Sequence, residues 1–268
     1  MPDSEPIKVN HGTPCRYSQI VIGDLDATTK TKVDPNFDIA SISGINIIFA
    51  NLEINFDGYF YCIGSFYNCT ITSRGFWETI HFSEQSNIIN CIFDCDKSAW
   101  SNNKILISFE EFKIYGCTLR DVVFLNANYA RSILIAKSIV NNAVLPIFEN
   151  SVISHSTFNN AERFEGKYIY GSVINLKKGV SAEIDMALIN STVTGSYDHI
   201  SIEMYTFAWA VCCFPVTSTG KEVIISNVTI NGSVIVNRNG GNFGLVGALI
   251  RAYYPKYSIS NLTCNLQV

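Results

Sequence analysis

Residues 68–71 read Asn68-Cys69-Thr70-Ile71, and a phrase of this kind returns about every 20 residues. Its slots hold a small polar residue, then Cys, Ser or Val, then a β-branched residue, then an apolar one. The further copies are Asn90-Cys91-Ile92-Phe93, Gly116-Cys117-Thr118-Leu119, Lys137-Ser138-Ile139-Val140, Asn150-Ser151-Val152-Ile153, Gly171-Ser172-Val173-Ile174 and Asn190-Ser191-Thr192-Val193. Such repetition, with strand-length β-branched runs and almost no helical pattern, predicts an all-β fold, a β-solenoid of about 20 residues per turn.

Side chains alternate between the two faces of a strand, so the phrase also predicts which residues are buried. Cys69 and Ile71 are expected to point inward, and Thr70 outward. In the next turns Phe93 is expected over Ile71, and Leu119 over Phe93. The first slot is expected to be a corner where side-chain amides hydrogen-bond along the solenoid axis. The asparagines predicted there are Asn68, Asn90, Asn150 and Asn190.

Nine cysteines occur in the chain, and three of them share one slot of the phrase. Cys69, Cys91 and Cys117 are expected to form an inward ladder with a spacing of about 4.8 Å. A straight ladder cannot place four ligands tetrahedrally, and its parallel Cβ vectors disfavour disulfides. We therefore expect reduced thiols that pack as small hydrophobes, with no metal site and no cofactor.

Composition excludes some classes of protein. The 268 residues are 47% hydrophobic and 16% charged, which is too apolar for a disordered chain. The formal net charge of −4 argues against a nucleic-acid partner, because such binding needs clustered Lys and Arg. No run approaches 18 apolar residues and no secretory signal opens the sequence, so we expect no membrane span and synthesis in a cytosol.

The chain is expected to have three parts. Residues 1–36 hold four of the seven prolines and lack the phrase, which predicts an N-terminal arm or cap. Residues 37–195 carry the phrase at solenoid spacing and form the β-helix body. In residues 196–268 the spacing lengthens, since Asn227 and Asn261 open phrases 34 residues apart, which predicts wider C-terminal turns.

The outward slot of the phrase is unusually apolar for a solvated strand. It reads Thr70, Ile92, Thr118, Ile139, Val152, Val173 and Thr192. A continuous apolar stripe on an outer face usually marks an interface. We therefore expect a homo-oligomer, and a trimer in particular, because closure around a three-fold axis would cover the stripe on every copy.

Over residues 37–268 the phrase resembles right-handed parallel β-helices of the phage tailspike and pectate-lyase type, whose turns carry inward Cys, Ser, Val and Ile and Asn at corners. A second resemblance lies near the C-terminus. Residues 225–232, Ile-Ser-Asn-Val-Thr-Ile-Asn-Gly, followed by residues 240–247, are similar to the glycine-rich GLUG repeat of bacterial surface adhesins. These resemblances imply either a polysaccharide lyase or hydrolase, a catalytically silent shaft, or an adhesin.

Asp94 and Asp96 form the best acidic pair for catalysis. They point to the same side of one strand, about 6.6 Å apart, close to the carboxyl separation of inverting glycosidases. In register, however, Asp94 is expected beside Arg120 and Asp96 beside Arg74. A neighbouring cation favours the charged carboxylate, whereas a general acid needs the opposite shift. An outer ion-pair ladder is therefore favoured over catalysis, and depolymerase activity stays open as the alternative.

Aromatic residues supply candidate ligand contacts, because aromatic faces beside polar turns suit the apolar and polar sides of sugar rings. The predicted ligand-binding residues are Trp77, Trp100, Tyr129, Trp209, Tyr253 and Tyr254.

Three hypotheses of function follow. The first is a structural or receptor-binding virion protein, such as a tailspike, fibre or capsid-associated β-helix, assembled in the host cytoplasm and recognising a surface glycan. The second is a β-helix polysaccharide lyase or glycoside hydrolase. The third is an adhesin segment at the bacterial cell surface.

Overall fold

The computed structural model describes residues 19–26, 28–33, 46–56, 60–73, 80–82, 86–95, 105–107, 111–124, 132–146, 150–198, 207–214, 222–235, 245–252 and 256–267. Every regular element in these ranges is a strand. The chain divides into two compact units, Met1–Leu134 and Ile135–Val268, which we describe separately. The all-β prediction is confirmed.

Thirteen strands lie in the described residues of the first unit, and the boundary falls within β14 (Ser132–Ala136). They are β1 (Gln19–Ile22), β2 (Thr31–Val33), β3 (Asn46–Ala50), β4 (Leu52–Phe56), β5 (Phe60–Tyr67), β6 (Thr70–Ser73), β7 (Ile80–Phe82), β8 (Ser86–Ile89), β9 (Ile92–Cys95), β10 (Ile105–Ile107), β11 (Glu111–Tyr115), β12 (Thr118–Arg120) and β13 (Val122–Phe124).

Twelve strands follow in the part of the second unit that the structure describes. They are β15 (Ile139–Asn141), β16 (Val144–Leu145), β17 (Asn150–Ser154), β18 (Thr157–Ala161), β19 (Arg163–Tyr170), β20 (Val173–Leu176), β21 (Ala182–Ile189), β22 (Thr192–Asp198), β23 (Phe207–Phe214), β24 (Glu222–Ile235), β25 (Leu245–Ala252) and β26 (Lys256–Gln267).

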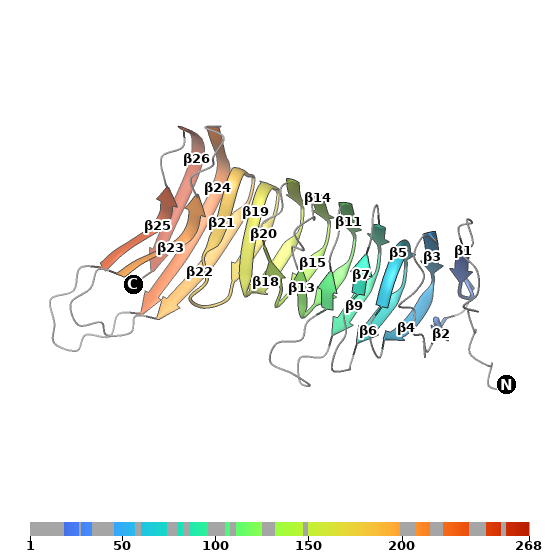
Figure 1. Ribbon diagram of the computed structural model, residues 1–268. Coiled ribbons are helices and arrows are strands. Elements are labelled where there is room, and N and C mark those ends of the chain that lie inside the picture. Colours follow the sequence, from blue (N-terminus) through green and yellow to red (C-terminus); the bar gives the residue numbers. More distant parts are fainter. Residues whose placement is uncertain are drawn as a thin grey trace. The chain divides into compact units, whose positions relative to one another are not determined.

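Strands that lie one coil apart in the sequence pair side by side, and they do so in parallel (Figure 1). In the first unit one stack runs β1, β3, β5, β8, β11, and a second runs β2, β4, β6, β9, β12. In the second unit the main stack runs β15, β18, β20, β22, β24, β26. Stacked parallel coils of this kind are what a β-solenoid requires.

Buried apolar rows run along both units. In the first unit Ile71, Phe93 and Leu119 are in register and 0% exposed, as the phrase predicted. In the second unit Phe158, Ile174 and Val193 form an equivalent row, also 0% exposed. Because each side chain packs on the one above and the one below, the core is a continuous column rather than a single cluster.

Each phrase begins at a corner whose residue has a left-handed backbone. In the first unit these residues are Asn51, Asn68, Asn90 and Gly116, with φ of 56°, 51°, 53° and 64°. Asparagine and glycine tolerate this region better than other residues do, which explains the first slot of the phrase. The Nδ2 of Asn68 donates to Oδ1 of Asn51 at 2.9 Å, so the predicted amide stacking is present here.

The residue after each corner turns its backbone N–H toward the interior. The side chain of the equivalent residue in the next coil accepts that hydrogen bond. The N–H of Cys69 donates to Sγ of Cys91 at 3.3 Å, and the N–H of Cys91 to Sγ of Cys117 at 3.4 Å. Each thiol donates back to the carbonyl two residues earlier, as Cys91 does to Ile89 at 3.3 Å. The slot therefore needs a small side chain that both donates and accepts.

Serine meets the same requirement in the second unit. The N–H groups of Ser138, Ser156 and Ser172 donate to Oγ of the serine one coil on, at 3.2, 3.2 and 3.1 Å, ending at Ser191. Each of the four hydroxyls donates to the carbonyl two residues earlier at 2.8–2.9 Å. The slot is thus a hydrogen-bonded ladder, which packing alone did not predict.

One copy of the phrase was assigned to the wrong register. Thr157 pairs with both Ile139 and Val173, so the copy in this slot is His155-Ser156-Thr157-Phe158 and not the one that starts at Asn150. His155 takes the corner with φ of 48°. Asn150 opens β17 instead, and Val152 pairs with Tyr168 on a different outer side of the unit. The register was assigned wrongly because the true corner holds His155 and not the asparagine that the phrase predicts.

The ladder predicts a pattern of thiol reactivity. Cys69, Cys91 and Cys117 are all buried, so a reagent cannot reach them in the native fold. Hydrogen bonds with Cys117 and Cys69, together with burial, also raise the pKa of Cys91, whereas the hydrogen bond with Cys91 lowers the pKa of Cys69 and of Cys117. Cys264 is exposed and serves as an internal control. At pH 8 an alkylating reagent should label Cys264 in the native protein, but Cys69, Cys91 and Cys117 only after denaturation, as read by peptide mass spectrometry. Rapid native labelling of all three would show that the ladder faces outward.

Candidate binding surfaces

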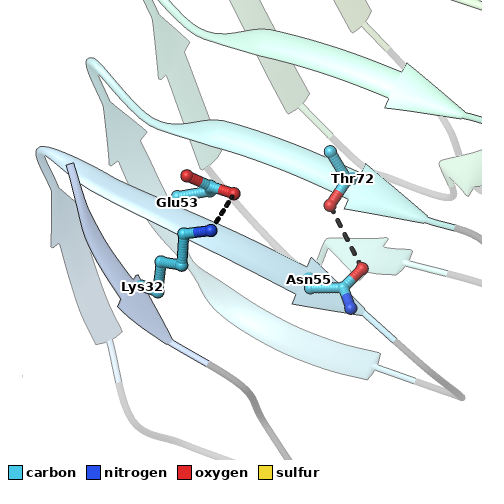
Figure 2. Close-up of polar contacts among 4 residues, drawn as sticks. All are labelled: Lys32, Glu53, Asn55 and Thr72. Carbon is cyan, nitrogen blue, oxygen red and sulfur yellow. Dashed lines mark hydrogen bonds and ion pairs between the residues drawn. The ribbon is translucent and has the colours of Figure 1, made fainter. Parts of the chain in front are cut away.

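The outer side of the first unit carries a polar row that contains Asp94. Figure 2 shows its start, where Thr72 on β6 donates to Oδ1 of Asn55 on β4 at 3.1 Å. Lys32 on β2 lies 3.6 Å from Glu53. Register places Asp94 next to Thr72. These contacts link neighbouring strands on the surface.

Arg120 follows Asp94 in this row, as the sequence predicted. Nη1 of Arg120 lies 3.5 Å from Oδ2 of Asp94, and the two side chains are 53% and 46% exposed. A surface ion pair of this kind contributes about 0–1 kcal/mol. The pairing favours a role in bracing two coils over a role as a general acid, which would need an environment that stabilises the protonated carboxyl.

Most of the other predicted site residues lie outside the described residues. This applies to Asp96, Trp77, Trp100, Tyr129, Tyr253 and Tyr254. Trp209 lies in β23, where its backbone pairs with Gly247 of β25. The catalytic role proposed for Asp96 and the ligand contacts proposed for the six aromatic residues stay predictions.

Two rows of uncharged side chains cover one outer side of the second unit, and we call this surface the neutral face. Its first row holds β-branched residues: Ile139, Thr157, Val173, Thr192, Thr229 and Thr263. Its second row lies two residues further along each strand: Asn141, Asn159, Asn175, Thr194, Asn231 and Asn265. The rows run about 6.6 Å apart, with about 4.8 Å between strands.

Hydrogen bonds within the second row hold its amides in place. Nδ2 of Asn159 donates to Oδ1 of Asn141 at 3.0 Å, and Nδ2 of Asn175 to Oδ1 of Asn159 at 3.1 Å. Asn265 donates to Asn231 in the same way at 2.9 Å. In the first row Ile139 and Val173 are 47% and 40% exposed. The face therefore combines exposed methyl groups with amides of defined orientation, and β-branching limits side-chain movement.

Sequence reasoning found part of the first row and none of the second. The predicted slot contained Ile139, Val173 and Thr192, had Val152 in place of Thr157, and did not extend to Thr229 and Thr263. The Asn row was missed because its members lie two residues after the phrase position used for alignment. A search at that offset would have found the recurring Asn in Asn141, Asn159, Asn175, Asn231 and Asn265.

A charged row crosses another outer side of the second unit. In register it holds Glu165, Glu183, Cys213 and Arg251, on β19, β21, β23 and β25. Glu165 is 7% exposed and forms an ion pair with Arg163. Burial raises the pKa of Cys213, against the lowering effect of a hydrogen bond with Ser181. The thiol is therefore not activated as a nucleophile near neutral pH.

Within the described residues no cluster of three or more His, Cys, Asp and Glu side chains is placed to hold a metal ion. The same residues include no helix of the length and hydrophobicity needed to cross a membrane.

Comparison with known proteins finds no matching family, no matching curated protein and no matching solved structure. The neutral face and the hydrogen-bonded ladders are therefore the features from which function has to be inferred.

Proposed function

We propose that this chain is a structural and receptor-binding virion protein, a right-handed parallel β-helix of the tailspike kind that assembles as a homotrimer in the host cytoplasm. The observation that carries this proposal is the neutral face. It places the exposed Ile139 and Val173 in one row with four threonines, and it has no charged side chain in either row.

The composition of the neutral face suits contact between copies. Burying it removes methyl groups from water, which is favourable, and it does not require the desolvation of any ion. The amides of the second row hydrogen-bond to one another, so burial of the face leaves few unpaired polar atoms. Closure around a three-fold axis would cover the same face on each copy.

Two further observations support the proposal. Cys69, Cys91, Cys117, Cys212, Cys213 and Cys264 form no disulfide, and the first four are buried, which fits folding in a reducing compartment. Asp94 is paired with Arg120, which supports a catalytically silent shaft over a depolymerase. Receptor glycan recognition is assigned to the aromatic residues predicted from the sequence.

Light scattering on the purified chain tests the assembly. We expect a mass of three chains, or a multiple of three, at micromolar concentration. Val173→Asp should reduce the assembled mass threefold, because three carboxylates would be buried near the axis. Ile224→Asp is the matched control: Ile224 is 42% exposed, similar to the 40% of Val173, but it lies on another outer side, paired with Ala187.

Circular dichroism should show that both variants keep the β-structure of the parent. A monomeric parent chain would contradict the trimer. Dissociation by Ile224→Asp but not by Val173→Asp would place the interface on the other outer side.

A further inference from the structure

One outer side of the first unit carries a row that contains two tyrosines, and we call it the tyrosine row. Each member comes directly before a corner, and the members in register on β3, β5, β8 and β11 are Ala50, Tyr67, Ile89 and Tyr115. The residues that precede the last three are 0% exposed and point inward, namely Phe66, Ile88 and Ile114. Since side chains alternate along a strand, the tyrosine row points outward, and Tyr115 is 41% exposed.

Polar groups border the tyrosine row on both sides. On one side the corners carry the exposed amides of Asn68 and Asn90. On the other side, two residues earlier on each strand, lie Ser65, Asn87 and Lys113. Nδ2 of Asn87 donates to Oγ of Ser65 at 3.4 Å, which restrains this amide. A strip of rings and methyl groups between two polar borders suits a sugar ring, which has apolar C–H faces and a polar rim.

The spacing of the tyrosine row suits a linear chain of sugars. Tyr67 and Tyr115 are two strands apart, about 9.6 Å by the strand spacing, and Ile89 lies between them. A sugar unit of an extended polysaccharide is comparable in length with one strand spacing. A polysaccharide that runs across the strands can therefore place successive rings over the members of the row.

Lys113 supplies the one charge in the tyrosine row and its two borders. Its side chain is exposed, and among the described residues none forms an ion pair with it. By contrast Lys32 and Arg120, on another outer side of the same unit, each lie beside a carboxylate. Lys113 is two residues before Tyr115 on β11, about 6.6 Å away. A ring on Tyr115 would bring its carboxylate within reach of this ammonium, so charge complementarity favours an acidic glycan.

We propose that the tyrosine row binds an acidic linear polysaccharide. Its rings lie on Tyr67 and Tyr115, and its carboxylate pairs with Lys113. Its hydroxyl groups hydrogen-bond to the corner amides of Asn68 and Asn90. The inference names the class and the place of the surface glycan, and it rests on the receptor-binding function proposed above. The neutral face belongs to the second unit, so one chain can bind the glycan without the trimer contact.

A glycan array tests the class of ligand. It carries oligogalacturonate, hyaluronan and oligosialic acid, with cello-, manno- and malto-oligosaccharides as neutral comparisons. We expect an acidic glycan to bind and the neutral ones to bind more weakly. A higher salt concentration should weaken the binding, because salt screens an exposed ion pair. Binding of no acidic glycan, or tighter binding of the neutral ones, would overturn the proposal.

Calorimetric titration with the acidic glycan that binds most tightly locates the site. Tyr115→Ala should raise the dissociation constant by about tenfold, because the stacked ring is lost, whereas Tyr115→Phe should leave it nearly unchanged. Ile92→Ala is the matched control: Ile92 is also 41% exposed in the first unit, but it lies on another outer side, paired with Thr118. Equal losses for Tyr115→Ala and Ile92→Ala, or none for either, would place the ligand elsewhere and overturn the site.

Lys113→Gln tests the charge. It should raise the dissociation constant by about fivefold and remove most of the salt dependence. Lys32→Gln removes the same charge from another outer side, where Lys32 lies 3.6 Å from Glu53, and should leave binding unchanged. Unchanged salt dependence in Lys113→Gln would contradict the carboxylate contact. Circular dichroism checks that each variant keeps the β-structure of the parent.

Failure of this proposal is distinguishable from failure of the trimer. If the trimer alone fails, the parent chain is a monomer that binds the acidic glycan and loses this binding with Tyr115→Ala. If the glycan site alone fails, the parent is a trimer, dissociated by Val173→Asp, that binds no acidic glycan. An assembled mass that falls with Tyr115→Ala would make the tyrosine row a contact between copies and overturn the glycan site.

Discussion

Replacement of Phe93 by alanine is expected to lower the free energy of unfolding by about 3–5 kcal/mol, the range for removal of a fully buried phenyl group. Phe93 is 0% exposed and lies between Ile71 and Leu119 in the core row of the first unit. Urea denaturation followed by circular dichroism measures the change.

Ile92→Ala is the matched control for this prediction. Ile92 precedes Phe93 on the same strand but points outward and is 41% exposed. Its removal should change the free energy of unfolding by less than about 1 kcal/mol. Equal losses for the two variants would mean that the inward and outward positions of β9 are not distinct.

Gly116→Val is expected to destabilise the first unit by about 2–4 kcal/mol. The backbone at Gly116 has a φ of 64°, a region that costs a β-branched residue about 1–3 kcal/mol. A Cβ atom there would also collide with Oδ1 of Asn90, so the Asn90 side chain would have to leave its position. Thermal unfolding and urea denaturation both measure the effect.

Gly116→Asn separates backbone strain from side-chain bulk. Asparagine accepts a positive φ and occupies the corners at Asn51, Asn68 and Asn90 in the same unit. Its Cβ displaces Oδ1 of Asn90 as that of valine does, but its amide can donate to the shifted Oδ1, as Asn68 does to Asn51. We expect a loss of less than about 1 kcal/mol for this variant. A loss as large as that of the valine variant would rule out the corner conformation as the cause.

The repeated phrase was sufficient to predict the strands, the inward row of Ile71, Phe93 and Leu119, and the contact of Asp94 with Arg120. These features depend on the alternation of side chains and on register, both of which are local in sequence. The identity of the second slot was interpreted less well. Cysteine and serine were treated as packing residues, because the inward N–H that they accept is a consequence of the corner geometry and leaves no trace in hydrophobic periodicity.

Functional residues were harder to predict because they depend on which side of the coil a strand occupies. Val152 and Thr157 both follow a serine and precede a buried residue, yet they lie on different outer sides. A short phrase cannot distinguish the two positions when the corner residue is atypical, as His155 is. The neutral face emerges only when register is known for all six strands, from β15 to β26.

The corners permit change in the length of the chain between them. Bonded partners in the corner and ladder positions are 22 and 26 residues apart in the first unit. In the second unit they are 18, 16 and 19 residues apart, and then 37 and 34. Each corner restores the same backbone conformation and the same contact to the previous coil, whatever the length between. Since the entropic cost of a longer loop grows only logarithmically, segments can be inserted or deleted between corners during evolution, and new surface loops can arise without disturbing the rows beneath them.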